Sequence, residues 1–528
     1  MKTRILLASV LSAVFFAIGI TALSSDADAA YFDDDQGFTY FILEDNQTVS
    51  LNSYYPDGDH HVENVIIPDT VEHDGVVYTV IDIFAIFYFD WIKTITIPEH
   101  IQSISLPAFT GENIESIIVD PENTYFESMD GILYNESMRS LLTYPCGKTD
   151  LSFEVPNSVG ILERRCFSGC LLEEITLPVQ LFAINSSAFA GCLNLSKINN
   201  TDGYNTLPDD IAIIDDDAFC DCTSLDNIIL PKNLRILGSC ALQGTALKTV
   251  EIPYSVSMVG FMAFSYCKEL ESITTDFNPI YKSEDGVLYK DDGFISLITY
   301  PAGKKDTEFS INTSTNDIWP GAFAGCEYLT KITLPNTMVM APREAFLDCY
   351  SLSEINLDSL LIIGDSAFEG CLNLHNITLG EDLASIGMLA FASTGLESVD
   401  IPDSVITISM EAFLDCTNLE IVNFREGCQT EIESDVFYQD NELYMISIYS
   451  EKLKFEDGAF DVGTIDEPAE IMVIKPKGYT LPENVVTDEY TILDIHDRGE
   501  RPYPYENFLG IFLCILVVIG IFKLFRGV

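Results

Sequence analysis

Fourteen cysteines are the residues with the most obvious chemical potential in this 528-residue sequence. Eight of them lie three residues after a phenylalanine, in copies of one local pattern: Cys170, Cys192, Cys222, Cys267, Cys326, Cys349, Cys371 and Cys416. Thiols in neighbouring turns stacked about 4.8 Å apart could form disulfides or bind a metal. Two further copies carry Thr245 and Thr394 at this position, which favours a small buried slot. We interpret the eight side chains as buried thiols and keep disulfides and metal binding as alternatives.

Acidic residues and histidines form a second group of candidate metal ligands. Their spacing matches no well-defined zinc or calcium motif. We interpret all three clusters as solvated acidic turns, and we predict no metal and no cofactor. The clusters are Asp57, Asp59, His60 and His61; Asp33 to Asp35; and Asp215 to Asp217.

Catalytic motifs are missing from the sequence. It contains no phosphate-binding glycine loop, no nucleophile elbow and no cysteine–histidine pair at a catalytic spacing. We therefore predict no catalytic residues, and an exported hydrolase is the least favoured of three functional hypotheses. Motifs for N-glycosylation occur at Asn46, Asn312 and Asn376.

The cysteine position belongs to a longer repeat, exemplified by Gly364 to Leu379 (GDSAFEGCLNLHNITL). Most copies follow one another at about 22 to 24 residues, within the range of leucine-rich repeats. Three intervals are longer: 30 residues after Phe189, 58 after Phe109 and 59 after Phe264. The anchoring residues are Phe87, Phe109, Phe167, Phe189, Phe219, Leu242, Phe264, Phe323, Phe346, Phe368, Phe391, Phe413, Phe437 and Phe460.

An Ile-x-Leu alternation follows each anchor, as at Ile377 and Leu379, and predicts a short strand with its apolar side inward. A second apolar residue usually stands five before the anchor, so we expect two short extended segments per turn. The middle residue of each alternation should point outward, and this face is our first candidate for binding. Its residues are Thr176, Ile229, Glu251, Thr333, Asn356, Thr378 and Asp400.

The two longest intervals contain matching insertions, at about 113–150 and 274–306. DGILYN at Asp130–Asn135 corresponds to DGVLYK at Asp285–Lys290, and LLTYPCGK at Leu141–Lys148 to LITYPAGK at Leu297–Lys304. Asp-Gly before an alternating apolar run predicts a β-hairpin. We expect two hairpin-like insertions, the second place to look for binding.

The two ends of the chain resemble export and anchoring segments. Residues 1–30 have the basic start, apolar run and small-residue exit of a signal peptide, with an uncleaved anchor as the alternative. Residues 508–525 predict a transmembrane helix, and the basic tail at 526–528 predicts a cytoplasmic C-terminus. Between these ends we predict an N-terminal β cap (31–80), the solenoid (81–460), a C-terminal cap (461–496) and a stalk (497–507).

Charge restricts the partners. The chain has 27 basic and 82 acidic residues and a formal net charge of −55. Such a field repels nucleic acid and anionic lipid, and it favours solubility and tolerance of salt. We therefore exclude nucleic acid as a partner and expect membrane contact only through the C-terminal helix.

Several repeat copies carry a family resemblance: AFAGCLNL (Ala188–Leu195), AFAGCEYL (Ala322–Leu329), AFEGCLNL (Ala367–Leu374) and AFLDCTNL (Ala412–Leu419). Together with VDPENTYFESMDGILYN (Val119–Asn135), they resemble the BspA-type leucine-rich-repeat surface proteins. The resemblance implies an extended right-handed solenoid displayed at a microbial cell surface. For some members it also implies binding of host or matrix proteins, and it implies no catalytic residues.

The sequence thus predicts a β-rich solenoid of short strands, with two insertions and one C-terminal transmembrane helix. Our leading hypothesis is a membrane-anchored cell-surface protein with its repeats extracellular, which binds a protein or glycan or mediates adhesion. The alternative is a non-catalytic coat or spacer protein of the cell envelope.

Overall fold

The structure, a computed structural model, describes residues 31–56, 62–200, 206–275, 277–440, 442–443, 445–450, 452–456, 459, 471–476 and 490–495. The predicted signal, stalk, transmembrane segment and cytoplasmic tail lie outside these residues, as do Phe460, the cluster from Asp57 to His61 and most of the C-terminal cap. No helix occurs in the described residues, and so none there could cross a membrane. The right-handed sense implied by the resemblance stays a prediction.

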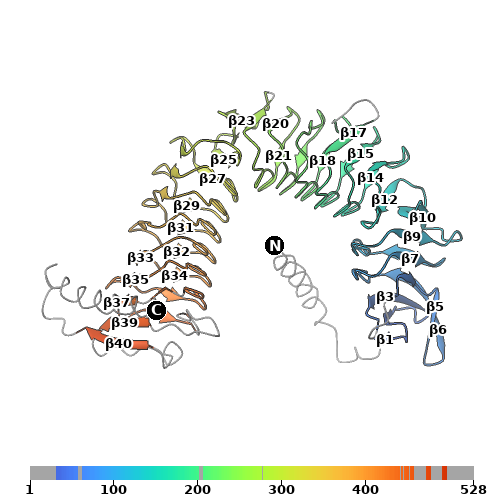
Figure 1. Ribbon diagram of the computed structural model, residues 1–528, viewed down its shortest axis with the longest axis horizontal. Helices are drawn as coiled ribbons and strands as arrows, with labels where there is room; N and C mark the ends of the chain where they lie inside the picture. The colour runs from blue at the N-terminus through green and yellow to red at the C-terminus, as the bar shows by residue number, and fades with distance from the viewer. Residues whose placement is uncertain are drawn as a thin grey trace, which may run out of the picture. The chain divides into compact units, whose positions relative to one another are not determined.

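The chain forms two compact units. The first extends to Lys305 and includes Ile318–Tyr328, and the second contains Asp306–Asp317 and the chain from Leu329 onward. Each unit is a β-solenoid in which successive turns stack and pair mostly in parallel (Figure 1). The predicted β-solenoid is therefore confirmed.

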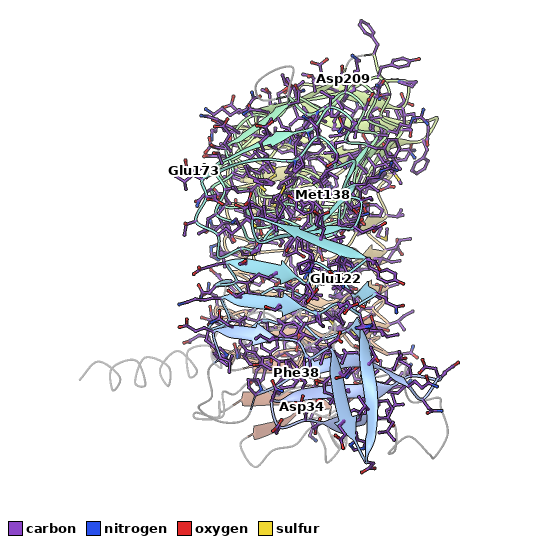
Figure 2. The ribbon with its side chains drawn as sticks, turned by 90° about the vertical axis from the view of Figure 1, so that its right-hand side faces the viewer. Asp34, Phe38, Glu122, Met138, Glu173 and Asp209 are labelled. Carbon is purple, nitrogen blue, oxygen red and sulfur yellow. The ribbon has the colours of Figure 1, made fainter. Side chains whose placement is uncertain are left out.

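The first unit begins with the β-rich segment 31–80, predicted as a cap, and with the first turns of the predicted solenoid. Its main sheet has the order β1-β2-β3-β6-β5, with β8 paired to β6, and a second sheet has the order β4-β7-β9. Asp34 and Phe38 lie together in the cap (Figure 2), where the Asp34 carboxylate accepts the Phe38 N–H at 3.0 Å. The strands are β1 (Tyr31–Asp33), β2 (Phe38–Ile42), β3 (Thr48–Tyr54), β4 (Asn64–Ile66), β5 (Thr70–His73), β6 (Val76–Ile83), β7 (Thr94–Ile97), β8 (Ser103–Ile104) and β9 (Ser116–Val119).

An ordinary turn contributes one strand to each of two faces. We call the face built by the Ile-x-Leu runs the long-strand face and the face built by two-residue strands the short-strand face. In the first unit the long strands are β13 (Ser152–Glu154), β15 (Glu174–Leu177), β17 (Lys197–Asn200), β20 (Thr249–Ile252) and β22 (Ser272–Thr275). The short strands are β14 (Ile161–Leu162), β16 (Ala183–Ile184), β18 (Ile213–Ile214), β19 (Ile236–Leu237) and β21 (Met258–Val259).

The second unit repeats this arrangement. Its long strands are β26 (Glu308–Ser310), β28 (Lys331–Thr333), β30 (Glu354–Ile355), β33 (Ser398–Ile401), β35 (Ile421–Phe424), β37 (Met445–Ile448), β39 (Ile471–Pro476) and β40 (Tyr490–Ile495). Its short strands are β29 (Met340–Ala341), β31 (Ile362–Ile363), β32 (Ser385–Ile386), β34 (Thr407–Ile408), β36 (Glu431–Ile432) and β38 (Lys454–Phe455). A further short strand, β27 (Asp317–Ile318), spans the boundary in sequence between the units.

Two predicted strands are absent. Ile228–Leu230 and Ile377–Leu379 form only single bridges, Ile229 to Thr206 and Leu379 to Leu357. A strand needs consecutive paired residues, and each of these two runs has only one. The alternation therefore predicted the inward side chains of these turns but not their pairing.

Stacked aromatic rings occupy the centre of both units. In the first unit, Phe189 lies 5.0 Å from Phe167 and 5.1 Å from Phe219 between ring centroids, with the rings nearly parallel. In the second, Phe368 stacks in the same way on Phe346 and Phe391 at 5.0 and 5.3 Å. Such pairs add stabilisation beyond the burial of their area.

The insertions are three-stranded antiparallel meanders, which confirms the predicted hairpins. Each also supplies a ring to the stack: Tyr144 lies 5.3 Å from Phe167, and Tyr300 lies 5.4 Å from Phe323. The two long intervals therefore each contain a complete extra turn. The strands are β10 (Phe126–Met129), β11 (Ile132–Asn135) and β12 (Ser140–Thr143), and β23 (Tyr281–Glu284), β24 (Val287–Asp291) and β25 (Ile295–Thr299).

Candidate binding surfaces

The cysteine slot is a buried feature of the core. Seven of its eight thiols are at most 1% exposed, and five of these seven, none of them in a disulfide, share one hydrogen-bonding pattern. Each of the five donates to the carbonyl of the anchoring residue one turn earlier, which agrees with the buried-thiol interpretation. The bonds run from Cys192 to Phe167 (2.9 Å), Cys222 to Phe189 (3.1 Å), Cys267 to Leu242 (3.1 Å), Cys371 to Phe346 (3.3 Å) and Cys416 to Phe391 (3.1 Å).

The acidic clusters that the structure describes form turns. Asp34 accepts hydrogen bonds from the backbone of Gln36 and Phe38 and from the Tyr40 hydroxyl. Asp216 accepts the Ser239 N–H of the next turn at 2.6 Å. Among the described residues no three His, Cys, Asp or Glu side chains are grouped to hold a metal ion. Asp34 and Asp216 thus have structural roles as hydrogen-bond acceptors.

A buried carboxyl takes the place of the thiol in the last turn whose anchor is described. Asp440 lies three residues after Phe437 and is fully buried. Its Oδ1 accepts the Cys416 N–H at 2.7 Å, whereas Oδ2 has no partner among the described residues. Burial raises the pKa of Asp440 well above its usual range, and Asp415 adds to the effect. Burial therefore favours the protonated form of this carboxyl.

The insertions are fixed by one buried asparagine each. Asn123 donates to the carbonyls of Pro98 (2.9 Å) and Ile101 (3.0 Å) in the preceding turn and accepts two backbone N–H groups of its own insertion. Asn278 does the same with Pro253 and Val256, both at 2.8 Å. These two asparagines connect each insertion to the turn before it.

The insertion strands are themselves mostly buried. In β11, Ile132 and Tyr134 join the hydrophobic core that continues along the repeats, whereas Leu133 joins the core of the cap. The strand is thus buried on both faces. This burial leaves little of β11 for recognition, although we named the insertions as the second place to look for binding.

The predicted binding residues point outward, as the alternation requires. Glu251, Thr333, Thr378 and Asp400 are exposed, and Thr176 and Asn356 are half-buried. They do not form one surface, however. In the first unit Thr176 and Glu251 belong to different sheets. In the second, the Asn356 amide bonds the backbone N–H and C=O of Leu334, and Asp400 accepts the Asn423 amide at 2.8 Å.

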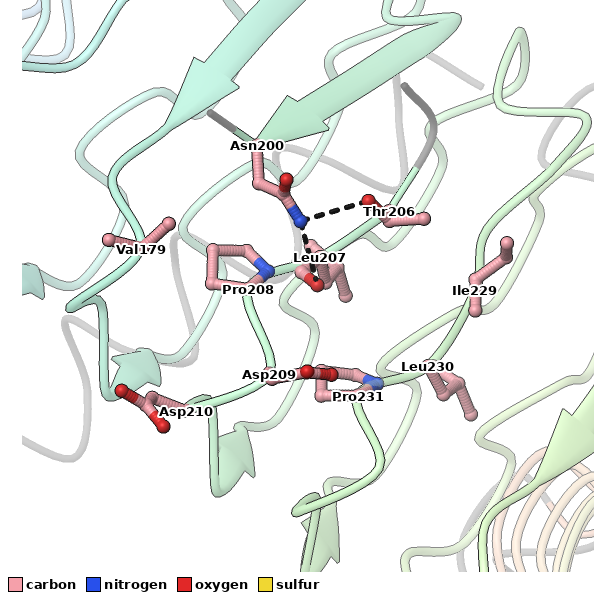
Figure 3. A pocket seen from close by; sticks show the side chains of 10 residues that line it. All are labelled: Val179, Asn200, Thr206, Leu207, Pro208, Asp209, Asp210, Ile229, Leu230 and Pro231. Carbon is pink, nitrogen blue, oxygen red and sulfur yellow. Dashed lines mark hydrogen bonds between the residues drawn. The ribbon is translucent and has the colours of Figure 1, made fainter. Parts of the chain in front are cut away.

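A hollow of about 450 Å³ opens beside the long-strand face of the first unit (Figure 3). Residues of successive turns line it. Pro208 and Pro231 lie in neighbouring turns, and the exposed Ile229 lies at one side. The Asn200 amide donates to the Thr206 hydroxyl at 2.9 Å. Asp209, on the rim, is ion-paired with Lys232. The hollow brings together proline, aliphatic and carboxylate groups, with no nucleophile next to a base.

A second hollow, of about 490 Å³, opens on the short-strand face of the same unit. It lies between Phe182 and Arg235, and Ala212, Ile213, Ile236 and the acidic Asp210 contribute to its lining. We looked for a binding face first along the Ile-x-Leu runs, and so we did not predict this hollow. The signal was present in the sequence, since Phe182, Ala212 and Arg235 each stand seven residues before an anchor.

Comparisons with known proteins agree with this fold. A model described as BspA type Leucine rich repeat region, present in six copies, matches residues 51–140, 144–209, 203–306, 300–362 and 342–465. A leucine-rich repeat protein structure from Eubacterium ventriosum is 21% identical, with a TM-score of 0.54, covering 64% of this chain and 92% of that one.

Two longer matches have lower TM-scores. A leucine rich cell surface protein of Faecalibacterium prausnitzii is 21% identical, with a TM-score of 0.41, covering 83% of this chain and 96% of that one. The pneumococcal vaccine antigen PcpA is 19% identical, with a TM-score of 0.40, covering 88% and 99%. No curated protein matches the chain in sequence.

Proposed function

Because the chain belongs to the BspA-type leucine-rich repeat family, we propose that it is a membrane-anchored cell-surface protein that binds an extracellular protein or glycan. The observation that carries the proposal is the pair of hollows in the first unit, each bordered by exposed apolar side chains, Ile229 in one and Phe182 in the other. Exposed apolar groups beside a hollow are typical of interaction sites. The proposed role is non-catalytic, as is general for leucine-rich repeat proteins.

Anchoring rests on the sequence of the two ends. The signal-like residues 1–30 support export, and the apolar segment 508–525 supports a single span with the repeats outside. Epitope tags after residue 31 and at Val528 test this topology on intact cells. The N-terminal tag should be accessible and the C-terminal tag protected. Access to both tags would rule out the anchored form.

Binding is tested with the purified full chain on panels of matrix proteins, host-cell proteins and glycans. We expect saturable binding to at least one panel member. A folded chain that binds none of them would contradict a ligand-binding role.

A coat or spacer role is the alternative, and the net charge of −55 favours it. Such a charge keeps neighbouring copies apart and hydrated. Deleting the gene should then change envelope permeability or salt tolerance and leave adhesion unchanged. The reverse result, lost adhesion with a normal envelope, would favour the binding role.

A further inference from the structure

A continuous apolar row runs along the short-strand face of the first unit. In each two-residue strand the second residue is buried, and the first is partly or fully exposed except in β16, where Ala183 is 8% exposed. The first residues are aligned by parallel pairing from β14 to β21: Ile161, Ala183, Ile213, Ile236 and Met258. Ile161 and Met258, at its ends, are 41% and 48% exposed. We call these five residues the apolar row.

The fold does not require apolar residues there. In the second unit, the first residues of the successive short strands are Met340, Ile362, Ser385, Thr407 and Glu431. The first two are apolar and the last three are polar. Those turns form the same parallel ladder with polar residues facing solvent. The apolar row of the first unit is thus a property of its surface sequence and not of the solenoid.

Arginines border the apolar row. Arg139 precedes β12, Arg164 and Arg165 follow β14, and Arg235 precedes β19, and all four are exposed. In the part of the chain that the structure describes, none of the four has a carboxylate partner within ion-pair distance. Arg343 and Arg425 of the second unit, in contrast, pair with Glu344 and Glu381, each at 2.7 Å. Burial raises the pKa of Asp217, and the charges of Arg164 and Arg165 oppose that rise. Arg139 and Arg235 therefore carry the unpaired positive charge of this surface, which is unexpected in a chain with three times as many acids as bases.

The hollow of about 490 Å³ lies beside this row because a small residue separates two large ones. The Ala212 N–H donates to the Phe182 carbonyl at 2.9 Å, and the Arg235 N–H donates to the Ala212 carbonyl at 2.8 Å. The three residues therefore stack in consecutive turns, and Ala212 leaves a gap between its neighbours. Phe182, at one side of this gap, is 57% exposed.

We propose that this surface binds an acidic polypeptide segment, which inserts an apolar side chain into the hollow and places carboxylates against Arg139 and Arg235. The inference rests on the proposed binding function and gives it a partner class. A floor of isoleucine, alanine and methionine fits aliphatic side chains better than a sugar ring, and guanidinium groups prefer carboxylates. Four strand spacings of about 4.8 Å separate Arg139 from Arg235, a span of roughly six extended residues.

The test uses the full chain and a fluorescein-labelled peptide of six Glu-Val repeats, measured by fluorescence anisotropy. We expect saturable binding that weakens at high salt, because exposed charges are screened. Matched peptides of Lys-Val and Glu-Ser repeats should not bind. Binding of the Lys-Val peptide as tightly as Glu-Val would overturn the acidic preference, and no binding of Glu-Val would overturn the inference.

Variants locate the site. The double change Arg139→Gln with Arg235→Gln, and separately Phe182→Ser, should each weaken peptide binding about tenfold or more, equivalent to losing about 1.4 kcal/mol. Arg343→Gln removes a paired arginine of the second unit and should leave binding unchanged. These side chains are exposed, so circular dichroism should show intact folds. Equal affinity in all variants would place the peptide elsewhere and overturn the site.

The same variants separate this inference from the proposed function. A panel ligand that binds the unaltered chain and all variants equally would overturn the site and leave the binding function intact. A chain that binds the peptide through Phe182 and the two arginines, but no panel member, would support the site and contradict the broader function.

Discussion

Thr394 and Cys416 occupy the same slot in neighbouring turns, with the Thr394 Oγ1 and the Cys416 Sγ 3.2 Å apart. Both donate to one acceptor, the Phe391 carbonyl, at 2.8 and 3.1 Å. Thr245 and Cys267 repeat this arrangement on the Leu242 carbonyl. The slot therefore selects a small side chain with a hydrogen-bond donor, which is why threonine can replace cysteine there.

Replacing Thr394 by valine tests this requirement. Thr394→Val keeps the shape and removes the hydroxyl donor, so the free energy of unfolding should fall by about 1 kcal/mol. Urea unfolding monitored by circular dichroism measures the change. Thr394→Cys is the matched control, since it keeps a donor of similar size, and it should cost less. Equal losses in the two variants would show that shape alone matters.

Alkylation distinguishes buried thiols from disulfides. Burial raises the pKa of the Cys267 thiol to about 11, so little of it is the reactive thiolate at pH 8. Iodoacetamide should therefore modify the slot cysteines slowly in the folded chain and rapidly after denaturation without reductant. Mass spectrometry of tryptic peptides gives the result for each cysteine. If the cysteines still resist alkylation after denaturation and become reactive only when reductant is added, they are in disulfides instead.

Removing the buried asparagine of an insertion should destabilise the first unit. Asn278→Ala leaves the Pro253 and Val256 carbonyls and two backbone N–H groups without this partner, at an expected cost of about 2–3 kcal/mol. Asn123→Ala should lower the stability by a similar amount, because Asn123 makes the same pattern of two donated and two accepted hydrogen bonds. Chemical denaturation measures both, with the exposed Asn194→Ala as control. A cost of less than about 0.5 kcal/mol in both variants would show that water replaces these bonds.

The repeat period predicted most of the core but not its interruptions. Each anchor from Phe167 to Phe437 that the period identified is buried in the aromatic or aliphatic stack. Tyr144 and Tyr300 were missed as members of the stack, because their Tyr-Pro context indicated only the end of a strand. Their role depends on the antiparallel meander before them, which returns the chain to the start of another turn. A fixed period cannot predict such a turn.

The binding surfaces were predictable only in part. The alternation predicts that the side chains of Glu251 and Asp400 point outward, but it does not predict which turns pair in one sheet. Arg235 became informative because no carboxylate of the described residues lies within ion-pair distance of it, although Asp210 lines the same hollow, and this depends on side chains of other turns. The hollow beside it depends on Ala212 standing between two large residues, a pattern visible in the sequence once the offset of seven residues is known.

Asp440 predicts an unusual dependence of stability on pH. Because burial raises the pKa of the folded carboxyl, the folded state holds its proton more tightly than the unfolded state, whose pKa is about 3.9. The contribution to stability is complete below that value and falls as the pH rises toward the folded pKa. Asp415 and Cys416 face the same site, and the pKa of the Cys416 thiol is also raised, chiefly by burial. The unfolded thiol, whose pKa is about 8.5, begins to ionise only as the pH approaches 8.

The expected result is a loss of stability of the second unit between pH 5 and pH 8. Asp440→Asn keeps the oxygen that accepts the Cys416 N–H and cannot ionise, so its stability should change less over the same interval. Urea midpoints of the two proteins at several pH values provide the measurement, and Asp415→Asn shows how much the neighbouring charge contributes. Parallel pH profiles for the unaltered chain and Asp440→Asn would mean that Asp440 does not titrate as a buried acid.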